Sequence, residues 1–227
     1  MINSPCPIIV MKPIHTLIIF DLDGTLADTS EGIYNCIRYA QAKMGLPPIS
    51  DEQMRSHIGP PMHESYERNF HLSGSDLEKA VSFHKEYALT KGLFEASLYE
   101  GIPQLLSQLK QRGYKLAVAT LKFEETAQKM LTFLNIAHFF DVICGALSEV
   151  KLTKSQLLAK CIQLCHSTKE TSLLIGDSSY DALGAQEAGI DFLGVTYGFG
   201  FTNKQEVDEF PNVGCAESVG DICKILS

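Results

Sequence analysis

The sequence predicts an α/β fold, in which an open parallel β-sheet carries an inserted α-helical domain. Short apolar runs, each bounded by polar residues or glycine, alternate with helical patterns over most of the chain. This alternation is typical of parallel strands joined by helical crossovers. One stretch, from about residue 28 to residue 98, contains helical patterns only. It therefore indicates a helical insertion after the first strand.

The predicted strands are continuously apolar rather than alternating, as expected of strands buried on both faces. They are residues 17–20, 116–119, 142–144, 173–175 and 192–195. Between them, amphipathic patterns predict helices at residues 102–111, 124–134, 154–165 and 181–188. Gly113 and Gly189 follow the first and last of these patterns, where glycine commonly ends a helix. Successive strands would be joined by right-handed crossovers.

The expected domain organisation is discontinuous. Residues 11–27 and 97–227 would form the α/β core domain, and residues 28–96 a helical cap domain. Residues 1–10 are expected to be a disordered N-terminal extension, because the first strand pattern directly follows Met11 and Lys12. Translation could therefore begin at Met11.

Composition limits the function classes. The chain has 227 residues, 45% of them hydrophobic, and a formal net charge of −8. That charge disfavours nucleic acid or an anionic membrane as the partner, and no apolar run approaches the length of a membrane span. The cysteines are scattered, and Cys161 and Cys165 are interpreted as core residues because no second Cys/His pair lies at zinc spacing. We expect a cytoplasmic monomer or homodimer that binds a small molecule.

Two carboxylates follow the first predicted strand, in the segment Asp21-Leu-Asp-Gly-Thr25. The carboxyl ends of parallel strands are where α/β sheets bind ligands. Repulsion between Asp21 and Asp23 would be relieved by a hard cation such as Mg²⁺ or by a shared proton. The alternative interpretation is a polar turn that ends a strand, which Asp and Gly commonly form.

Three further segments place polar groups at the ends of other strands. Thr120 ends the second strand and is either a phosphate contact or a helix cap. Lys151 and Lys154 lie at the start of a helix, where a lysine would be favoured by a bound anion. Asp177 and Asp181, four residues apart, follow the fourth strand and could reach the same cation. Together these groups suit attack on a phosphoryl group held by Mg²⁺ and positive charge.

These residues resemble the four motifs of the haloacid dehalogenase superfamily. The resemblance extends from Leu17 to Gly200 and includes the helical insertion after the first motif. It rests on Phe20-Asp-Leu-Asp-Gly-Thr-Leu26, Ala119-Thr120, Lys154 and Gly176-Asp-Ser-Ser-Tyr-Asp181. Within the superfamily, further segments are similar to phosphoglycolate phosphatase-like members, namely Ile58-Gly-Pro-Pro61, Tyr99-Glu-Gly-Ile102 and Gly194-Val-Thr-Tyr-Gly-Phe-Gly200.

The resemblance implies a Mg²⁺-dependent phosphatase that acts through an aspartyl-phosphate. Asp21 would be the nucleophile and Asp23 the general acid and base. Mg²⁺ would be held by Asp21, the backbone carbonyl of Asp23 and Asp177, with Asp181 in support. Thr120, the backbone amide of Leu121 and one lysine would bind the phosphoryl oxygens. Lys154 is the expected lysine because it opens a helix that runs into Leu157-Leu158, and Lys151 is the alternative.

Other functions stay open at this stage. A sugar phosphomutase of the same superfamily, similar to β-phosphoglucomutase, would return the phosphoryl group to a second hydroxyl. A non-catalytic protein that binds a phosphorylated ligand would be expected to lack the nucleophile or the acid, and both are present. Carbon as the electrophile, as in dehalogenases, would not need Asp23 or the cation. Five cap residues could contact substrate but are more simply interpreted as solvated surface groups, namely Arg38, Arg55, His57, His63 and Tyr66.

Overall fold

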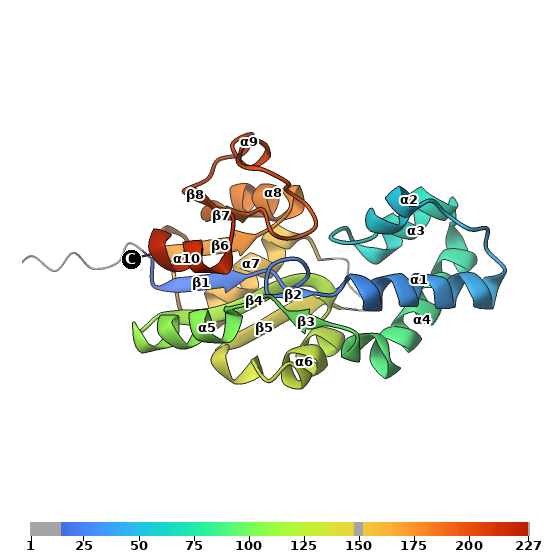
Figure 1. Cartoon of the computed structure of the whole chain (residues 1–227), viewed down its shortest axis with the longest axis horizontal. Helices are drawn as coiled ribbons and strands as arrows, with labels where there is room; N and C mark the ends of the chain where they lie inside the picture. Colours follow the sequence, from blue (N-terminus) through green and yellow to red (C-terminus); the bar gives the residue numbers. More distant parts are fainter. Residues whose placement is uncertain (1–14, 148–151, 227) are drawn as a thin grey trace, which may run out of the picture.

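The computed structural model describes residues 15–147 and 152–226. Within these residues the chain forms a six-stranded sheet of parallel strands in the order β5-β4-β1-β6-β7-β8 (Figure 1). The strands are β1 (Leu17–Phe20), β4 (Lys115–Phe123), β5 (Val142–Ala146), β6 (Ser172–Gly176), β7 (Asp191–Val195) and β8 (Gly214–Ala216). The α/β prediction and its strands are confirmed. The apolar-run pattern misses β8, because this edge strand is three residues long and begins with glycine.

Helices cover both faces of the sheet, which gives three layers (Figure 1). They are α5 (Ile102–Gln111), α6 (Glu124–Phe133), α7 (Lys154–Leu164), α8 (Ser179–Ala188), α9 (Lys204–Val207) and α10 (Val219–Ile225), with 3₁₀ turns η2 (Ala137–Phe139) and η3 (Lys169–Thr171). Ile18 and Phe20 pack toward α5, α6 and α10. Leu17 and Ile19, which alternate with them, pack toward α7, α8 and α9. Cys161 and Cys165 lie buried in this second layer, as expected of core residues.

A helical lobe lies beyond the carboxyl ends of β1 and β4 (Figure 1). Its elements are α1 (Ser30–Met44), α2 (Asp51–Arg55), α3 (Met62–Phe70), α4 (Gly74–Thr90) and the 3₁₀ turn η1 (Gly92–Phe94). These helices pack around their own apolar cluster, formed by Ala40, Tyr66, Leu77, Ala80 and Val81. In the part of the chain that the structure describes, no helix is long and apolar enough to span a bilayer.

The lobe joins the sheet through a two-stranded antiparallel ribbon. Strand β2 (Ala27–Asp28) pairs with β3 (Ser97–Leu98), so the chain leaves the sheet and returns at adjacent points. The expectation that residues 28–98 contain no strand is therefore wrong at both ends. Two-residue strands are too short to show a period in sequence. The division into a core domain and a cap domain, at the boundaries given above, stays a proposal.

Strand β1 lies at the centre of the sheet, between β4 and β6. The chain runs outward from β1 to β4 and β5 and then returns to β6 on the other side of β1. The carboxyl ends of β4, β1 and β6 are consequently adjacent at the point where the strand order reverses. Open α/β sheets bind ligands at this kind of point. Three of the polar segments singled out in the sequence, those with Asp21, Thr120 and Asp177, lie at these carboxyl ends, and Lys154 follows β5.

Candidate active site

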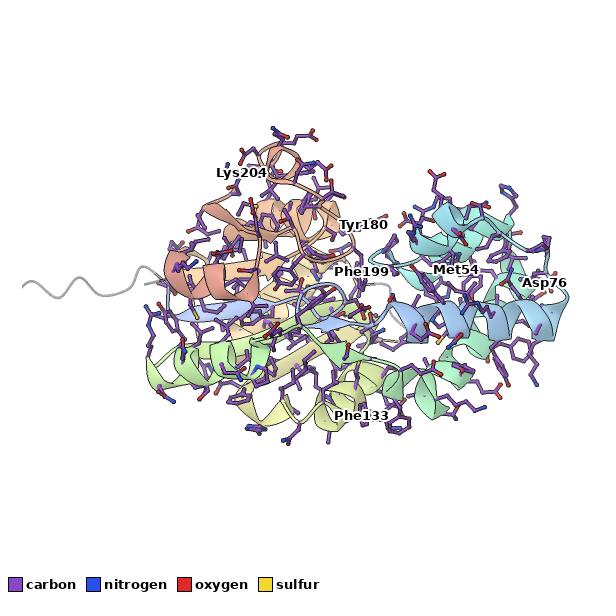
Figure 2. All side chains as sticks on the ribbon, in the orientation of Figure 1. Met54, Asp76, Phe133, Tyr180, Phe199 and Lys204 are labelled. Carbon is purple, nitrogen blue, oxygen red and sulfur yellow. The ribbon has the colours of Figure 1, made fainter. Side chains whose placement is uncertain are left out.

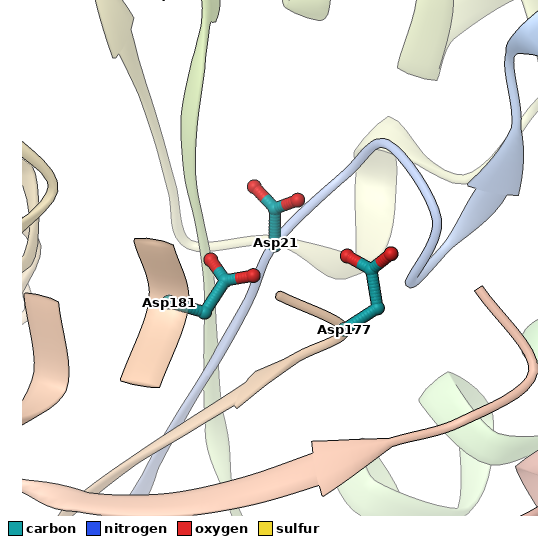
Figure 3. Close-up of side chains that lie close together, drawn as sticks. All are labelled: Asp21, Asp177 and Asp181. Atoms are coloured by element: carbon teal, nitrogen blue, oxygen red, sulfur yellow. The ribbon is translucent and has the colours of Figure 1, made fainter. Parts of the chain in front are cut away.

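Three buried carboxylates meet at the carboxyl end of the sheet (Figure 3). Asp21 follows β1, Asp177 follows β6, and Asp181 lies in the first turn of α8. One oxygen of each lies within 4.8 Å of those of the other two. The structure thus brings together carboxylates that are up to 160 residues apart in sequence. Oxygen ligands in such a cluster suit a hard divalent cation.

Local hydrogen bonds orient two of these carboxylates. The Asp181 Oδ2 atom accepts hydrogen bonds from the Ser178 amide at 3.1 Å and hydroxyl at 2.7 Å, in a capping box that starts α8. The Asp177 Oδ2 atom accepts from the amides of Phe199, at 2.8 Å, and Gly200, at 3.0 Å. These hydrogen bonds use one oxygen of each carboxylate, which leaves the other oxygen for partners within the cluster.

Glycine at position 24 is required by the close approach of Asp177. Gly24 has a φ of 84°, a conformation that residues with a Cβ rarely adopt. A Cβ at this position would also overlap the Asp177 carboxylate. The turn after Asp23 can therefore pass against the carboxylate cluster only because this residue has no side chain.

Lys154 places one ammonium group against the cluster. Its Nζ atom lies 2.6 Å from Asp21 Oδ1, 2.7 Å from Asp181 Oδ1 and 2.7 Å from the Ala119 carbonyl oxygen. A capping box between Thr153 and Gln156 starts α7 and so places Lys154 at the first helical position. The carboxylates of Asp21 and Asp181 are therefore the anions that favour a lysine at this helix N-terminus. Lys151, the alternative, lies outside the described residues.

Burial governs the protonation of the carboxylates. Burial raises the pKa of Asp21 well above its usual value; Lys154 opposes this shift, and Asp181 and Asp177 add to it. Burial, with Asp181 beside it, also raises the pKa of Asp177 to about 7. Burial opposes the ionised form of Lys154, but the two carboxylates outweigh it and raise the pKa of its ammonium group. A single ammonium group therefore does not compensate three carboxylates.

Asp23 is not one of the three clustered carboxylates. Its Oδ1 atom accepts a hydrogen bond from the Thr29 hydroxyl at 2.5 Å and lies 3.2 Å from Lys122 Nζ. Both Asp23 and Lys122 line the cavity above Asp21. The sequence analysis missed Lys122, although its place two residues after Thr120, at the end of a strand, was an available signal.

Thr120 is buried beside Asp21 and lines the same cavity, as does Leu121. Its hydroxyl accepts a hydrogen bond from the Lys122 amide at 3.2 Å. The alternative that Thr120 caps a helix is wrong, since β4 continues to Phe123 and α6 begins only at Glu124.

The surface interpretation of the five lobe residues is wrong for two of them. Tyr66 is fully buried in the core of the lobe, and His57 is 7% exposed and lines the cavity. Arg38 and Arg55 are exposed. His63 lies on the lobe surface, where its Nε2 atom is 3.4 Å from Glu78 Oε1. Sequence could not separate these cases, because α1 and α3 bury only one face each.

The family follows from comparison with known proteins. The model for haloacid dehalogenase-like hydrolases matches residues 18–195, which include all three clustered carboxylates and Lys154. The chain belongs to this family. A solved structure of a haloacid dehalogenase-like hydrolase family protein from Streptococcus pneumoniae superposes with a TM-score of 0.85 and 34% identity, covering 94% of this chain and 99% of that one.

Relatives of this hydrolase carry different names. Tyrosine-protein kinase PtkA from Mycobacterium tuberculosis is 38% identical over 81% of the chain, and the match covers 63% of that relative's length. A 5'-nucleotidase from Pseudomonas aeruginosa is 32% identical, over 88% of this chain and 90% of that protein. A phosphoglycolate phosphatase from Caulobacter vibrioides is 30% identical, over 86% and 85%. The resemblance to phosphoglycolate phosphatase-like members is therefore confirmed at the level of similarity.

Proposed function

We propose that this hydrolase is a Mg²⁺-dependent phosphatase, which removes phosphate from a small monoester through an aspartyl-phosphate on Asp21. The observation that carries the proposal is the buried cluster of Asp21, Asp177 and Asp181 against the single ammonium group of Lys154. Relatives named 5'-nucleotidase and phosphoglycolate phosphatase support it.

The residues at the site fit a magnesium ion. The pKa values of Asp21 and Asp177 are raised, and Asp181 lies close to both carboxylates. A divalent cation would offset the repulsion among the three carboxylates. Mg²⁺ favours carboxylate and carbonyl oxygens as ligands. Asp21, Asp177, the backbone carbonyl of Asp23 and, in support, Asp181 would hold it. When bound, the metal would neutralise charge on the phosphoryl oxygens.

The remaining residues divide the chemistry. The Asp21 carboxylate attacks phosphorus in line, so that a P–O bond forms to Asp21 and the bond to the leaving oxygen breaks. Asp23 gives its proton to the leaving oxygen and then takes one from the water that hydrolyses the aspartyl-phosphate. Lys154, the Thr120 hydroxyl and the Leu121 amide bind the phosphoryl oxygens. The lobe excludes bulk water, which strengthens these contacts.

The test is an assay of released phosphate with a panel of monoesters, in Mg²⁺ or EDTA. We expect hydrolysis that requires Mg²⁺ and that falls by about a thousandfold or more in Asp21→Asn, because the nucleophile is lost. Asp76→Asn removes an exposed carboxylate on α4 and is the matched control, with activity unchanged. Isomerisation of a sugar phosphate without net release would instead favour a mutase, and binding without turnover a phospho-ligand carrier.

Metal binding is measured separately from activity. Mg²⁺ should raise the melting temperature of the wild-type protein by mass action, because it binds only the folded site. Asp177→Asn should lose most of this increase, while Asp76→Asn keeps it. An equal increase in all three proteins would contradict the metal site.

A further inference from the structure

Two buried polar atoms without a hydrogen-bond partner belong to residues that line the candidate active-site cavity. They are His57 Nε2, in the segment between α2 and α3, and Ser65 Oγ, on α3. The two residues are 7% and 1% exposed, and both line the cavity that contains Asp21 and Lys154. Leaving such a group unpaired costs the folded protein free energy. A ligand that supplies the missing partners would recover this cost.

The helix around Ser65 does not satisfy its hydroxyl. A serine inside a helix commonly donates to a backbone carbonyl one turn earlier. Here the Pro61 carbonyl accepts the Ser65 amide at 3.1 Å, and the Ser65 hydroxyl has no partner. The Ser65 hydroxyl therefore keeps its capacity to donate and to accept a hydrogen bond.

The lobe wall of the cavity carries two histidines and one serine among apolar residues, and no carboxylate. The lobe residues that line it are Ile33, His57, Gly59, Pro60, Met62, Ser65 and His84. Burial lowers the pKa of His57 to about 4 and that of His84 to about 3, so both are neutral near pH 7. Lys122 adds one ammonium group near Asp23. Such a wall favours oxygen atoms of a substrate, whether neutral or anionic.

The cavity is small and partly open to solvent, with a volume of about 60 Å³. Drug-sized ligands occupy pockets of roughly 300–1,000 Å³. A nucleoside would therefore extend out of the cavity or hold the lobe away from the sheet, whereas a leaving group of a few atoms fits beneath the lobe.

We propose that His57 and Ser65 form the leaving-group subsite, and that the substrates are phosphate monoesters of short compounds with an oxygen-bearing group near the ester. This inference rests on the proposed phosphatase function and deepens it. The phosphoryl group lies against Asp21, Lys154 and Thr120, and the leaving group points to the lobe. His57 Nε2 and Ser65 Oγ hydrogen-bond its carboxylate, carbonyl or hydroxyl oxygen.

The test compares kcat/KM for four substrates: 2-phosphoglycolate, glycerol phosphate, ethyl phosphate and AMP. Ser65→Ala and His57→Leu each remove one of the two polar atoms. We expect each substitution to lower kcat/KM about tenfold for whichever of 2-phosphoglycolate and glycerol phosphate the wild-type protein hydrolyses better. A tenfold loss corresponds to one hydrogen bond of about 1.4 kcal/mol. Hydrolysis of ethyl phosphate, which lacks an oxygen-bearing group near the ester, should change less than twofold. The first two substrates separate an anionic from a neutral leaving group.

Thr126→Val is the matched control. Thr126 is equally buried, and its hydroxyl also lacks a partner, but it lines a different cavity, between α1, α4 and α6. The Thr126→Val variant should have the same substrate preference as the wild-type protein. Ser65→Ala should melt no lower than the wild type, because it removes an unpaired buried hydroxyl and introduces a good helix former.

Two outcomes would overturn the subsite. One is an equal loss on ethyl phosphate in both variants, and the other is a preference for AMP over every short ester in the wild type. If the wild-type protein hydrolyses no ester at all, the proposed phosphatase function fails together with the subsite. If it hydrolyses esters but shows either of the two outcomes above, only the subsite fails.

Discussion

Lys154 connects the clustered carboxylates to the scaffold. Its ammonium group contacts Asp21 and Asp181, and its aliphatic chain lies against α8 at Gly184. A Cβ at position 184 would come within 2.5 Å of Lys154 Cγ. Alanine would favour the helix by about 1 kcal/mol, so glycine at this position is explained by packing against the lysine rather than by helix propensity.

Removal of this buried charge should destabilise the metal-free protein. In Lys154→Met, two carboxylates lose their cation, and breaking a buried ion pair from one side costs about 3–5 kcal/mol. We expect a loss of this size in the free energy of unfolding, measured by urea denaturation in EDTA. Mg²⁺ should recover part of the loss.

Lys160→Met is the control on the same helix. Lys160 pairs with Glu124 at 3.1 Å, but its side chain is 38% exposed, so its loss should cost less than about 1 kcal/mol. Equal losses in the two variants would show that the Lys154 contacts do not stabilise the fold.

The helices of the lobe enclose titratable groups that burial keeps neutral. His84 on α4 shares a 3.1 Å hydrogen bond between its Nδ1 atom and the Tyr66 hydroxyl on α3. His57 packs against the Tyr66 ring, with centroids 5.4 Å apart. Burial lowers the pKa of both histidines, and Lys122 and Arg68 add to the effect on His84 and His57 respectively.

This arrangement predicts that acid weakens the lobe. The pKa of His84 is about 3 in the folded protein and about 6.5 when exposed, so the unfolded chain binds more protons between these values. The free energy of unfolding should therefore fall as the pH drops below 6.5, by up to about 1.4 kcal/mol per pH unit for this histidine. Thermal melts from pH 7.5 to pH 4.5 would measure the slope.

His84→Gln keeps a polar group in place and removes the titration, so its slope should be smaller. His63→Gln, on the lobe surface beside Glu78, controls for the loss of a histidine. If the slopes of wild type and His84→Gln coincide, His84 does not couple protonation to folding.

At the scale of the whole molecule, the lobe and the sheet meet over the active site. The β2–β3 ribbon joins them on one side. On the other, the Tyr180 hydroxyl of α8 donates to Glu64 of α3 at 2.6 Å, next to Asp181. Figure 2 shows Tyr180 on the edge of the sheet layer that faces the lobe. This hydrogen bond favours the closed arrangement.

Tyr180→Phe should shift the molecule toward an open arrangement. The loss of one hydrogen bond of about 1 kcal/mol should raise KM about fivefold and increase the radius of gyration measured by small-angle scattering. Tyr39→Phe breaks a similar bond to Glu86 within the lobe and should change neither quantity. A normal KM in Tyr180→Phe would contradict this role of the bond.

The sequence determined the fold class and most of the chemical groups. Continuous apolar runs identify buried parallel strands, because both faces of such strands are covered by helices. Polar residues directly after those runs, such as Asp21, Thr120 and Asp177, mark the edge of the sheet where ligands bind. These signals are local in sequence, so they can be recognised without a structure.

Only the tertiary structure decided which groups meet. The Lys154 contact with Asp21 depends on the order of strands in the sheet, which brings together residues that are 133 positions apart. Ser65 and His57 carry no distinguishing pattern in sequence, because their burial and their missing hydrogen-bond partners arise only from packing. Burial and pairing are properties of the packed molecule, since they arise from contacts between elements that the sequence does not order in space.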